Sequence, residues 1–161
     1  MFRKLRRGPK VVMTRPVSPE FDPTGLYDPS GYWVLPVGGE EVSQVAIDYA
    51  FNLIMSMGWG SLTVRISCPF TVVKDDEVRR YDPEDTMSLG ELLYLHKAVA
   101  EDARAREDGR LTIKFVGGSR IDVEPDPQYE AFHVTAGYPP NKQLFELIAM
   151  PGGGLATTEP L

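Results

Sequence analysis

The chain is poor in the residues from which many catalytic and metal sites are built. Its 161 residues include one cysteine, Cys68, and two histidines, His96 and His133. A single cysteine excludes an internal disulfide framework and a cysteine-based zinc site. Because Cys68 lies among apolar residues, we interpret it as a small buried side chain rather than a catalytic thiol.

Long apolar runs are also missing. No stretch of 18 apolar residues occurs, so we expect no membrane-spanning helix. The N-terminus is basic, but no apolar segment of signal-peptide length follows it. We therefore expect a cytoplasmic location.

Acidic residues are absent from the first nineteen positions and abundant after them. Residues 20–161 hold all 23 acidic side chains and 11 of the 17 Lys and Arg residues, so this part carries −12 and the N-terminus +6. The six basic residues of the N-terminus are Arg3, Lys4, Arg6, Arg7, Lys10 and Arg15. An acidic body repels phosphate, so only the N-terminus is suited to polyanions.

Proline divides the chain into two parts. Six prolines interrupt residues 1–36, where apolar periodicity is absent, and we expect a basic, Pro-rich tail and linker there. Residues 37–161 are expected to form a single domain, because 42% of the chain is hydrophobic and suffices for one core.

Alternating apolar residues predict two hairpins. From Val45 to Met57 one parity is apolar, and a second strand follows over 62–66. A four-residue loop over 58–61 would place Met57 opposite Leu62. Further on, a three-residue loop over 117–119 would join two more strands.

For the second hairpin a three-residue loop is favoured over a two-residue turn, which would place charges on the apolar face. The longer loop pairs Phe115 with Ile121 and sets Lys114 opposite Asp122, a favourable cross-strand pair. Further strands are expected near 131–135 and 144–150, joined by a turn over 138–141. The glycines at 152–154 are expected to form a turn into a short last strand.

One helix is expected between the hairpins. Ser88 and Glu91 fit a capping box, and Gly109 can end the helix. Its apolar stripe would comprise Leu89, Leu92, Leu93, His96, Val99, Ala100 and Ala103. The expected fold class is α+β: an antiparallel β-meander packed against one main helix, after an irregular N-terminal tail.

The sequence contains only weak candidates for catalytic, metal-binding or phosphate-binding motifs. His96 in the helical stripe could be a general base, but a core histidine bonded to a backbone carbonyl explains it as well. Asp122, Glu124 and Asp126 share a parity and could hold a hard cation, although a solvated strand edge is the better interpretation. The glycines at 152–154 lack the Lys of a phosphate loop. We predict no catalytic residue, metal or cofactor.

Two features favour a protein partner. Trp59 lies between glycines at a hairpin tip, where an exposed indole would be a contact, although folding back over the sheet is equally consistent. An acidic hairpin turn follows at 75–77. The predicted partner contacts are Trp59, Asp75, Asp76, Glu77 and Asp126.

From about residue 42 to 156 the chain resembles a family of small, uncharacterised bacterial domains common in high-GC Gram-positive bacteria. The motifs that carry the resemblance are Cys68-Pro69-Phe70, Asp82-Pro83-Glu84-Asp85, Gly109-Arg110-Leu111 with the following Gly117-Gly118, Pro125 to Phe132, and Pro151 to Ala156. Such domains look like proteins encoded near polymorphic toxins, which implies an immunity-like role. The resemblance implies no catalytic residue. The chain departs from the expected pattern at Phe132, where a Trp is expected, and at Thr157.

Three functions follow as hypotheses. The leading one is a non-enzymatic, immunity-like protein-binding module whose acidic surface meets a basic partner. The alternative is tethering to a polyanion, nucleic acid or an anionic membrane, through the basic tail. The third is a small hydrolase or ligand-binding domain around His96 and His133. An exposed sheet edge could also pair two copies, which the sequence neither demands nor forbids.

Overall fold

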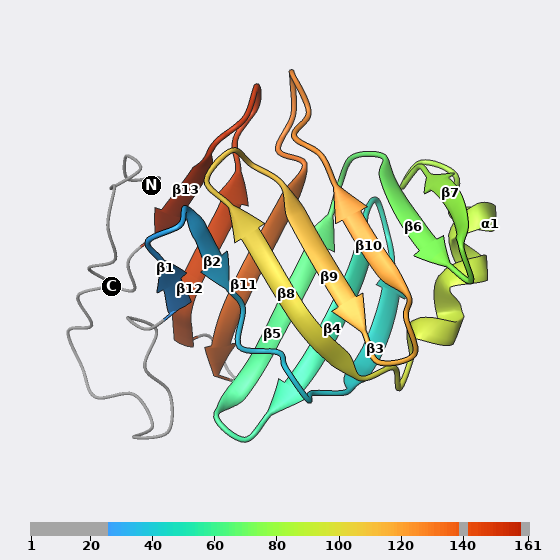
Figure 1. Cartoon of the computed structure of the whole chain (residues 1–161), viewed down its shortest axis with the longest axis horizontal. Coiled ribbons are helices and arrows are strands. Elements are labelled where there is room, and N and C mark those ends of the chain that lie inside the picture. The colour runs from blue at the N-terminus through green and yellow to red at the C-terminus, as the bar shows by residue number, and fades with distance from the viewer. Residues whose placement is uncertain (1–25, 139–141, 159–161) are drawn as a thin grey trace.

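Two antiparallel β-sheets lie face to face around one apolar core (Figure 1). The computed structural model describes residues 26–138 and 142–158. The seven-stranded sheet contains, in spatial order, β1 (Tyr27–Asp28), β2 (Tyr32–Val34), β8 (Ala100–Arg106), β9 (Leu111–Phe115), β10 (Arg120–Val123), β6 (Phe70–Lys74) and β7 (Glu77–Tyr81).

The second sheet has six strands. In spatial order it contains β13 (Leu155–Thr158), β12 (Lys142–Ala149), β11 (Phe132–Tyr138), β5 (Gly60–Ile66), β4 (Phe51–Met57) and β3 (Val42–Ile47). A short helical segment, α1 (Thr86–Leu89) and the 3-10 helix η2 (Gly90–Leu95), lies at the end of the sandwich beside β7 (Figure 1). The predicted α+β class is therefore corrected to a mostly β fold with one short helix.

Alternation along the strands builds the core as expected. Leu62, Val64 and Ile66 of β5 are fully buried, while Thr63 and Arg65 between them are only partly buried. Since neighbouring strands share this parity, each sheet turns one apolar face toward the other.

The first hairpin has a shorter loop than expected. Residues 58 and 59 form a two-residue turn, and Met57 pairs with Gly60 instead of Leu62. Met55 then pairs with Leu62. The predicted register is wrong by two residues, which leaves the apolar face unchanged because side chains repeat every two residues.

The pairing of the second hairpin is also shifted by two residues from the expected one. Ile121 pairs with Ile113, and Lys114 lies opposite Arg120, so the predicted pairing of Lys114 with Asp122 is wrong. Asp122 instead accepts a hydrogen bond from Thr112 Oγ1 at 3.0 Å and forms an ion pair with Arg120 Nε at 2.7 Å.

The loop of that hairpin begins one residue earlier than expected. Phe115 N donates to Ser119 O, so Val116 joins the loop and is 64% exposed. Gly117 and Gly118 both have positive φ, which a side chain would strain.

The predicted helix is wrong over most of its length. The observed helical segment begins at an N-cap formed by Asp85, whose carboxylate accepts a hydrogen bond from Ser88 N at 3.3 Å, and it ends at Leu95. Leu89, Leu92 and Leu95 are its buried residues.

The rest of the predicted helix is strand β8. Ala103 and Ala105 face the core, and Arg104 between them is exposed. Alanine and arginine favour helices intrinsically, but β8 is flanked by β2 and β9, and burial between two strands outweighs that preference.

Residues 27–36, which the sequence places in the tail, contribute β1 and β2 to the seven-stranded sheet. Trp33 is 7% exposed and Leu35 2% exposed, and both belong to the core. The prolines of this segment lie at turns or beyond strand ends, where they remove no ladder bond.

The C-terminal strands agree with prediction. β11 and β12 correspond to the strands expected near 131–135 and 144–150, and β13 follows the glycine turn at 152–154. Gly153 N donates to Met150 O within that turn. Positions 139–141 of the predicted connecting turn lie outside the described residues.

Candidate functional site

The hairpin of β6 and β7 forms one end of the seven-stranded sheet. Its turn consists of Asp75 and Asp76, with φ of 51° and 62°, so both occupy the left-handed region that a type I′ turn requires. Lys74 and Glu77 close the turn as opposed residues. The acidic turn predicted from the sequence is therefore a two-residue hairpin connection.

A groove of about 480 Å³ lies between this hairpin and η2. The hairpin contributes Lys74, Glu77, Arg79 and Tyr81, and η2 contributes Glu91 and Tyr94. Arg79 shares the parity of the core-facing residues, since it pairs with the buried Val72, and its side chain therefore extends toward η2. The groove thus has charged and aromatic walls.

Ion pairs fix the groove walls. Arg79 Nε lies 2.9 Å from Glu77 Oε1, and Arg79 Nη1 lies 3.0 Å from Glu91 Oε2. The Tyr81 hydroxyl donates to the same Glu91 oxygen at 3.0 Å. Burial, reinforced by this carboxylate, raises the pKa of Tyr81. On the other wall, Lys74 Nζ lies 3.8 Å from the centre of the Tyr94 ring, a cation–π contact.

Apolar side chains are exposed on the same helical segment. Met87 is 89% exposed, Leu93 53% and Tyr94 39%. The sequence pattern predicts Leu93 in a buried stripe, and that prediction is wrong because the segment is a 3-10 helix with three residues per turn. We call the exposed residues Met87, Leu93 and Tyr94, with the acidic hairpin residues 75–77, the end surface.

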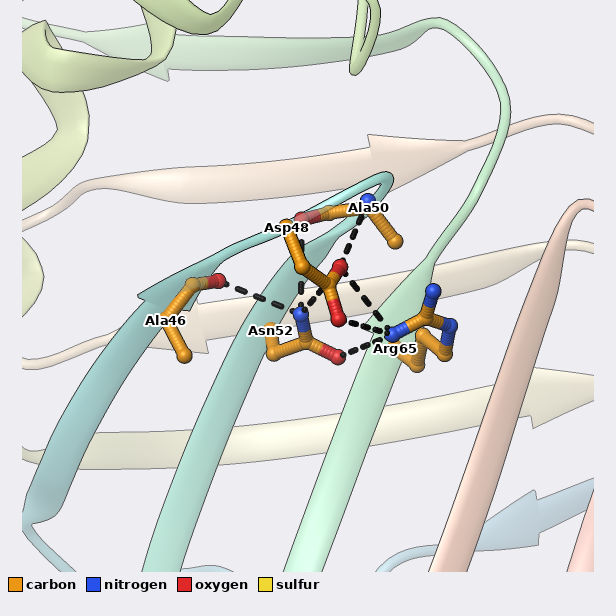
Figure 2. Close-up of polar contacts among 5 residues, drawn as sticks. All are labelled: Ala46, Asp48, Ala50, Asn52 and Arg65. Carbon is orange, nitrogen blue, oxygen red and sulfur yellow. Dashed lines mark hydrogen bonds and ion pairs between the residues drawn. The ribbon is translucent and has the colours of Figure 1, made fainter.

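A polar cluster occupies the outer face of the six-stranded sheet (Figure 2). Arg65 Nη1 of β5 donates to both carboxylate oxygens of Asp48, at 2.8 and 3.1 Å, and to Asn52 Oδ1 at 3.3 Å. Asn52 Nδ2 donates to the Ala46 and Ala50 carbonyls. The Arg65 hydrogen bond lowers the pKa of Asp48. These bonds tie the β3–β4 turn to β5, and we assign the cluster a structural role.

The two histidines do not form a site. His133 lies on the same outer face, opposite Arg65, and its Nε2 contacts the Glu146 carboxylate of β12. His96 is the exposed C-cap of η2, not the core residue that the helical stripe predicted. No contact joins His96 to His133 within residues 26–138.

The other predicted contacts are dispersed. Trp59 lies in the β4–β5 turn, partly buried and packed against the core. That turn and strand β7 lie at different ends of the molecule (Figure 1). Asp126 follows β10 and accepts from the backbone N–H groups of Gln128 and Tyr129, which lower its pKa. The six basic tail residues lie outside the described residues. Of the predicted contacts, only residues 75–77 belong to the end surface.

Cys68 is buried, and burial raises the pKa of its thiol to about 11, with nearby Asp126 adding to the shift. Near neutral pH this lowers the thiolate fraction by about 100-fold. We expect a disulfide reagent at pH 8 to react at least ~100-fold more slowly with the folded protein than with the urea-unfolded chain. A Tyr49→Cys variant of the same protein, with its new thiol at a 93% exposed position, is the fast-reacting control. Equal rates for folded and unfolded Cys68 would contradict the assignment.

The described residues contain no group of three or more His, Cys, Asp or Glu side chains arranged to hold a metal ion. Within the same ranges no helix is long and apolar enough to cross a membrane.

Sequence reasoning missed Arg79, Glu91 and Tyr94 because it placed 91 and 94 on a long amphipathic helix. The acidic hairpin turn at 75–77 was predicted, but no sequence pattern indicated that Arg79 lies beside Glu91. No pattern in the sequence indicates that the Met87 side chain is exposed.

Comparison with known proteins identifies a family that covers most of the chain. The family model described as "Family of unknown function (DUF6188)" matches residues 33–159. No curated protein and no solved structure matches the chain. The match begins at Trp33, in agreement with the structural role of β2.

Proposed function

Since the chain belongs to DUF6188, a family of unknown function, we propose a function from its surface: a non-enzymatic protein-binding module, immunity-like in neutralising another protein by contact alone. The end surface is the proposed contact. The observation that carries the proposal is the exposure of Met87, Leu93 and Tyr94 together on one short helical segment, beside an acidic turn.

Exposed apolar side chains on one short segment can be covered together by a single partner, and an aromatic ring at a groove is a typical anchor. The acidic residues 75–77 beside them favour a partner with a basic contact region. Such charges mainly speed encounter and select among partners, whereas the apolar residues supply the binding free energy. Trp59 and Asp126 lie outside this surface, and the proposal does not use them.

Leu93→Asp is expected to abolish partner retention. The full-length tagged protein is purified from its native cells, and the co-purifying proteins are compared between variants by mass spectrometry. A partner held through the end surface is lost from Leu93→Asp, because a charge replaces an exposed apolar contact of that surface.

The matched control is Val116→Asp, which places the same charge at an exposed position in the β9–β10 loop. It should retain the partner. Reversal of the charges at Asp75, Asp76 and Glu77 should weaken retention and change its salt dependence. A partner that Leu93→Asp retains as well as the wild type does, and that Trp59→Ala loses, would overturn the placement of the contact and favour the β4–β5 turn.

The second proposal is polyanion tethering through Arg3, Lys4, Arg6, Arg7, Lys10 and Arg15. The observation in its favour is the separation of +6 in the first nineteen residues from −12 in the rest. Binding to nucleic acid or anionic vesicles should then fall steeply with salt and vanish without residues 1–19. Salt-independent or absent binding contradicts this alternative.

A further inference from the structure

The free edge of β7 has an order of charges that fits a second copy of itself. β7 is the outermost strand of its sheet, and only β6 pairs with it among the described residues. Because Lys74 and Glu77 close a two-residue turn, Glu77, Arg79 and Tyr81 direct their backbone groups toward β6. The N–H and C=O groups of Val78 and Arg80 therefore point away from the sheet.

The side chains along this edge run acidic, acidic, apolar, basic, basic from Asp76 to Arg80. Val78 at the centre is 66% exposed, and the charged residues on either side of it are exposed as well. In an antiparallel pair of identical strands centred on Val78, each acid of one copy faces a base of the other.

We propose that the protein forms a two-fold symmetric dimer in which the β7 strands of two copies pair antiparallel, with Val78 opposite Val78. In this register Glu77 of each copy faces Arg79 of the other. Asp76 of each copy comes beside Arg80 of the other at the end of the pair. The two seven-stranded sheets then join into one.

Geometry and charge together select this register. Residues that oppose each other in an antiparallel pair lie on the same face, so a two-fold pair of β7 strands must be centred on a residue. Among registers centred on residues 77–80, centring on Glu77, Arg79 or Arg80 places two like charges directly opposite, which is destabilising. Centring on Val78 places opposite charges across the pair and covers an exposed apolar side chain.

Arg79 stays accessible to a second copy despite its internal ion pairs. Arg79 already bridges Glu77 and Glu91 within one chain, but its side chain is 53% exposed. Pairing would bring two such groups together into one network of alternating charge, in which opposite charges face each other across the strands. The dimer shares Asp76 and Glu77 with the end surface, but the inference rests on the β7 edge and does not require the proposed partner.

The first test is the mass of the full-length protein in solution, by sedimentation equilibrium from micromolar to millimolar concentration. We expect a reversible monomer–dimer equilibrium for the wild type that weakens as salt is added. Val78→Pro should abolish the dimer, because it removes an N–H group that points to the free edge. It should leave the fold intact, since proline is tolerated at such edge positions. A wild-type protein that stays monomeric throughout, or a dimer that survives Val78→Pro, overturns the proposal.

Complementary charge variants test the register itself. Glu77→Lys and Arg79→Glu each place like charges opposite in a homodimer, so each should raise the dissociation constant by about tenfold or more. A one-to-one mixture of the two variants should restore dimers, because opposite charges then face each other again at both of these positions. Circular dichroism melts establish that both variants are folded. Failure of the mixture to associate more strongly than either variant alone would exclude the Val78-centred register.

Discussion

Replacing Trp33 with alanine is expected to lower the free energy of unfolding by about 3–5 kcal/mol. The indole is buried, lies opposite Ala105 of β8 and packs edge-on against Tyr27, with ring centres 5.4 Å apart. Truncation removes a large apolar surface and leaves a cavity between the two sheets, which a backbone held by β8 cannot close. Urea denaturation followed by circular dichroism measures the loss.

Tyr49→Ala is the matched control, since it removes an aromatic side chain that is almost fully exposed. Its effect should stay within about 0.5 kcal/mol. If the two variants unfold at the same urea concentration, residues 27–36 are an appendage, as their proline content suggests, and β2 contributes nothing to the stability of the domain.

The second large effect is expected from Gly109→Ala, a loss of about 2–4 kcal/mol. Gly109 has φ of +93°, and an added Cβ would lie 3.0 Å from Gly154 N and 3.1 Å from Gly154 O. These are backbone atoms of the turn before β13, which cannot move aside as a flexible side chain would. Thermal or urea unfolding of the variant reports the loss.

Gly117→Ala separates the two causes of that loss. Gly117 has a similar φ of +98°, but no atom lies within 4 Å of the position of its added Cβ. This variant therefore carries only the strain of the left-handed backbone, about 1 kcal/mol. Equal losses for the two glycines would mean that the β8–β9 turn and the turn before β13 do not pack closely in solution.

The strands with clean alternation were predictable, and those without it were not. β4, β5, β9 and β10 carry alternating apolar residues, so their existence and buried faces followed from the sequence. Their registers did not, because a shift of two residues keeps every side chain on its face and changes only the position or length of the loop.

β8 shows why a helix was predicted where the structure has a strand. Its buried positions are alanines, whose small side chains fit between the two sheets and also favour helices. The leucines before β8 follow a true helix start at Asp85, and their spacing extended the predicted helix into this strand. The segment forms a strand because β2 and β9 pair with it on either side. No local sequence pattern contains that information.

Only the acidic turn of the end surface could be predicted from the sequence. Its acidic turn stands out in the sequence, because residues 75–77 are three consecutive acidic residues that follow an apolar segment. The exposed residues of the helical segment were not predictable, because a 3-10 helix presents a different face from an α-helix. Trp59 was identified by its flanking glycines, but the sequence did not indicate that its ring packs against the core.

The order of strands has a consequence for how the chain folds as it is made. β2 lies beside β8, β5 beside β11 and β6 beside β10, so every strand pairing that joins the two halves of the chain spans a long stretch of sequence. Such pairings require the closure of long loops, and proteins dominated by them fold in milliseconds to seconds. A growing chain that has reached β7 can form three local units, the β1–β2 hairpin, the β3–β4–β5 meander and the β6–β7 hairpin, yet their apolar faces have no cover. The partly synthesised protein is therefore the form most prone to aggregate, and it gains its stability only when the last strands emerge from the ribosome.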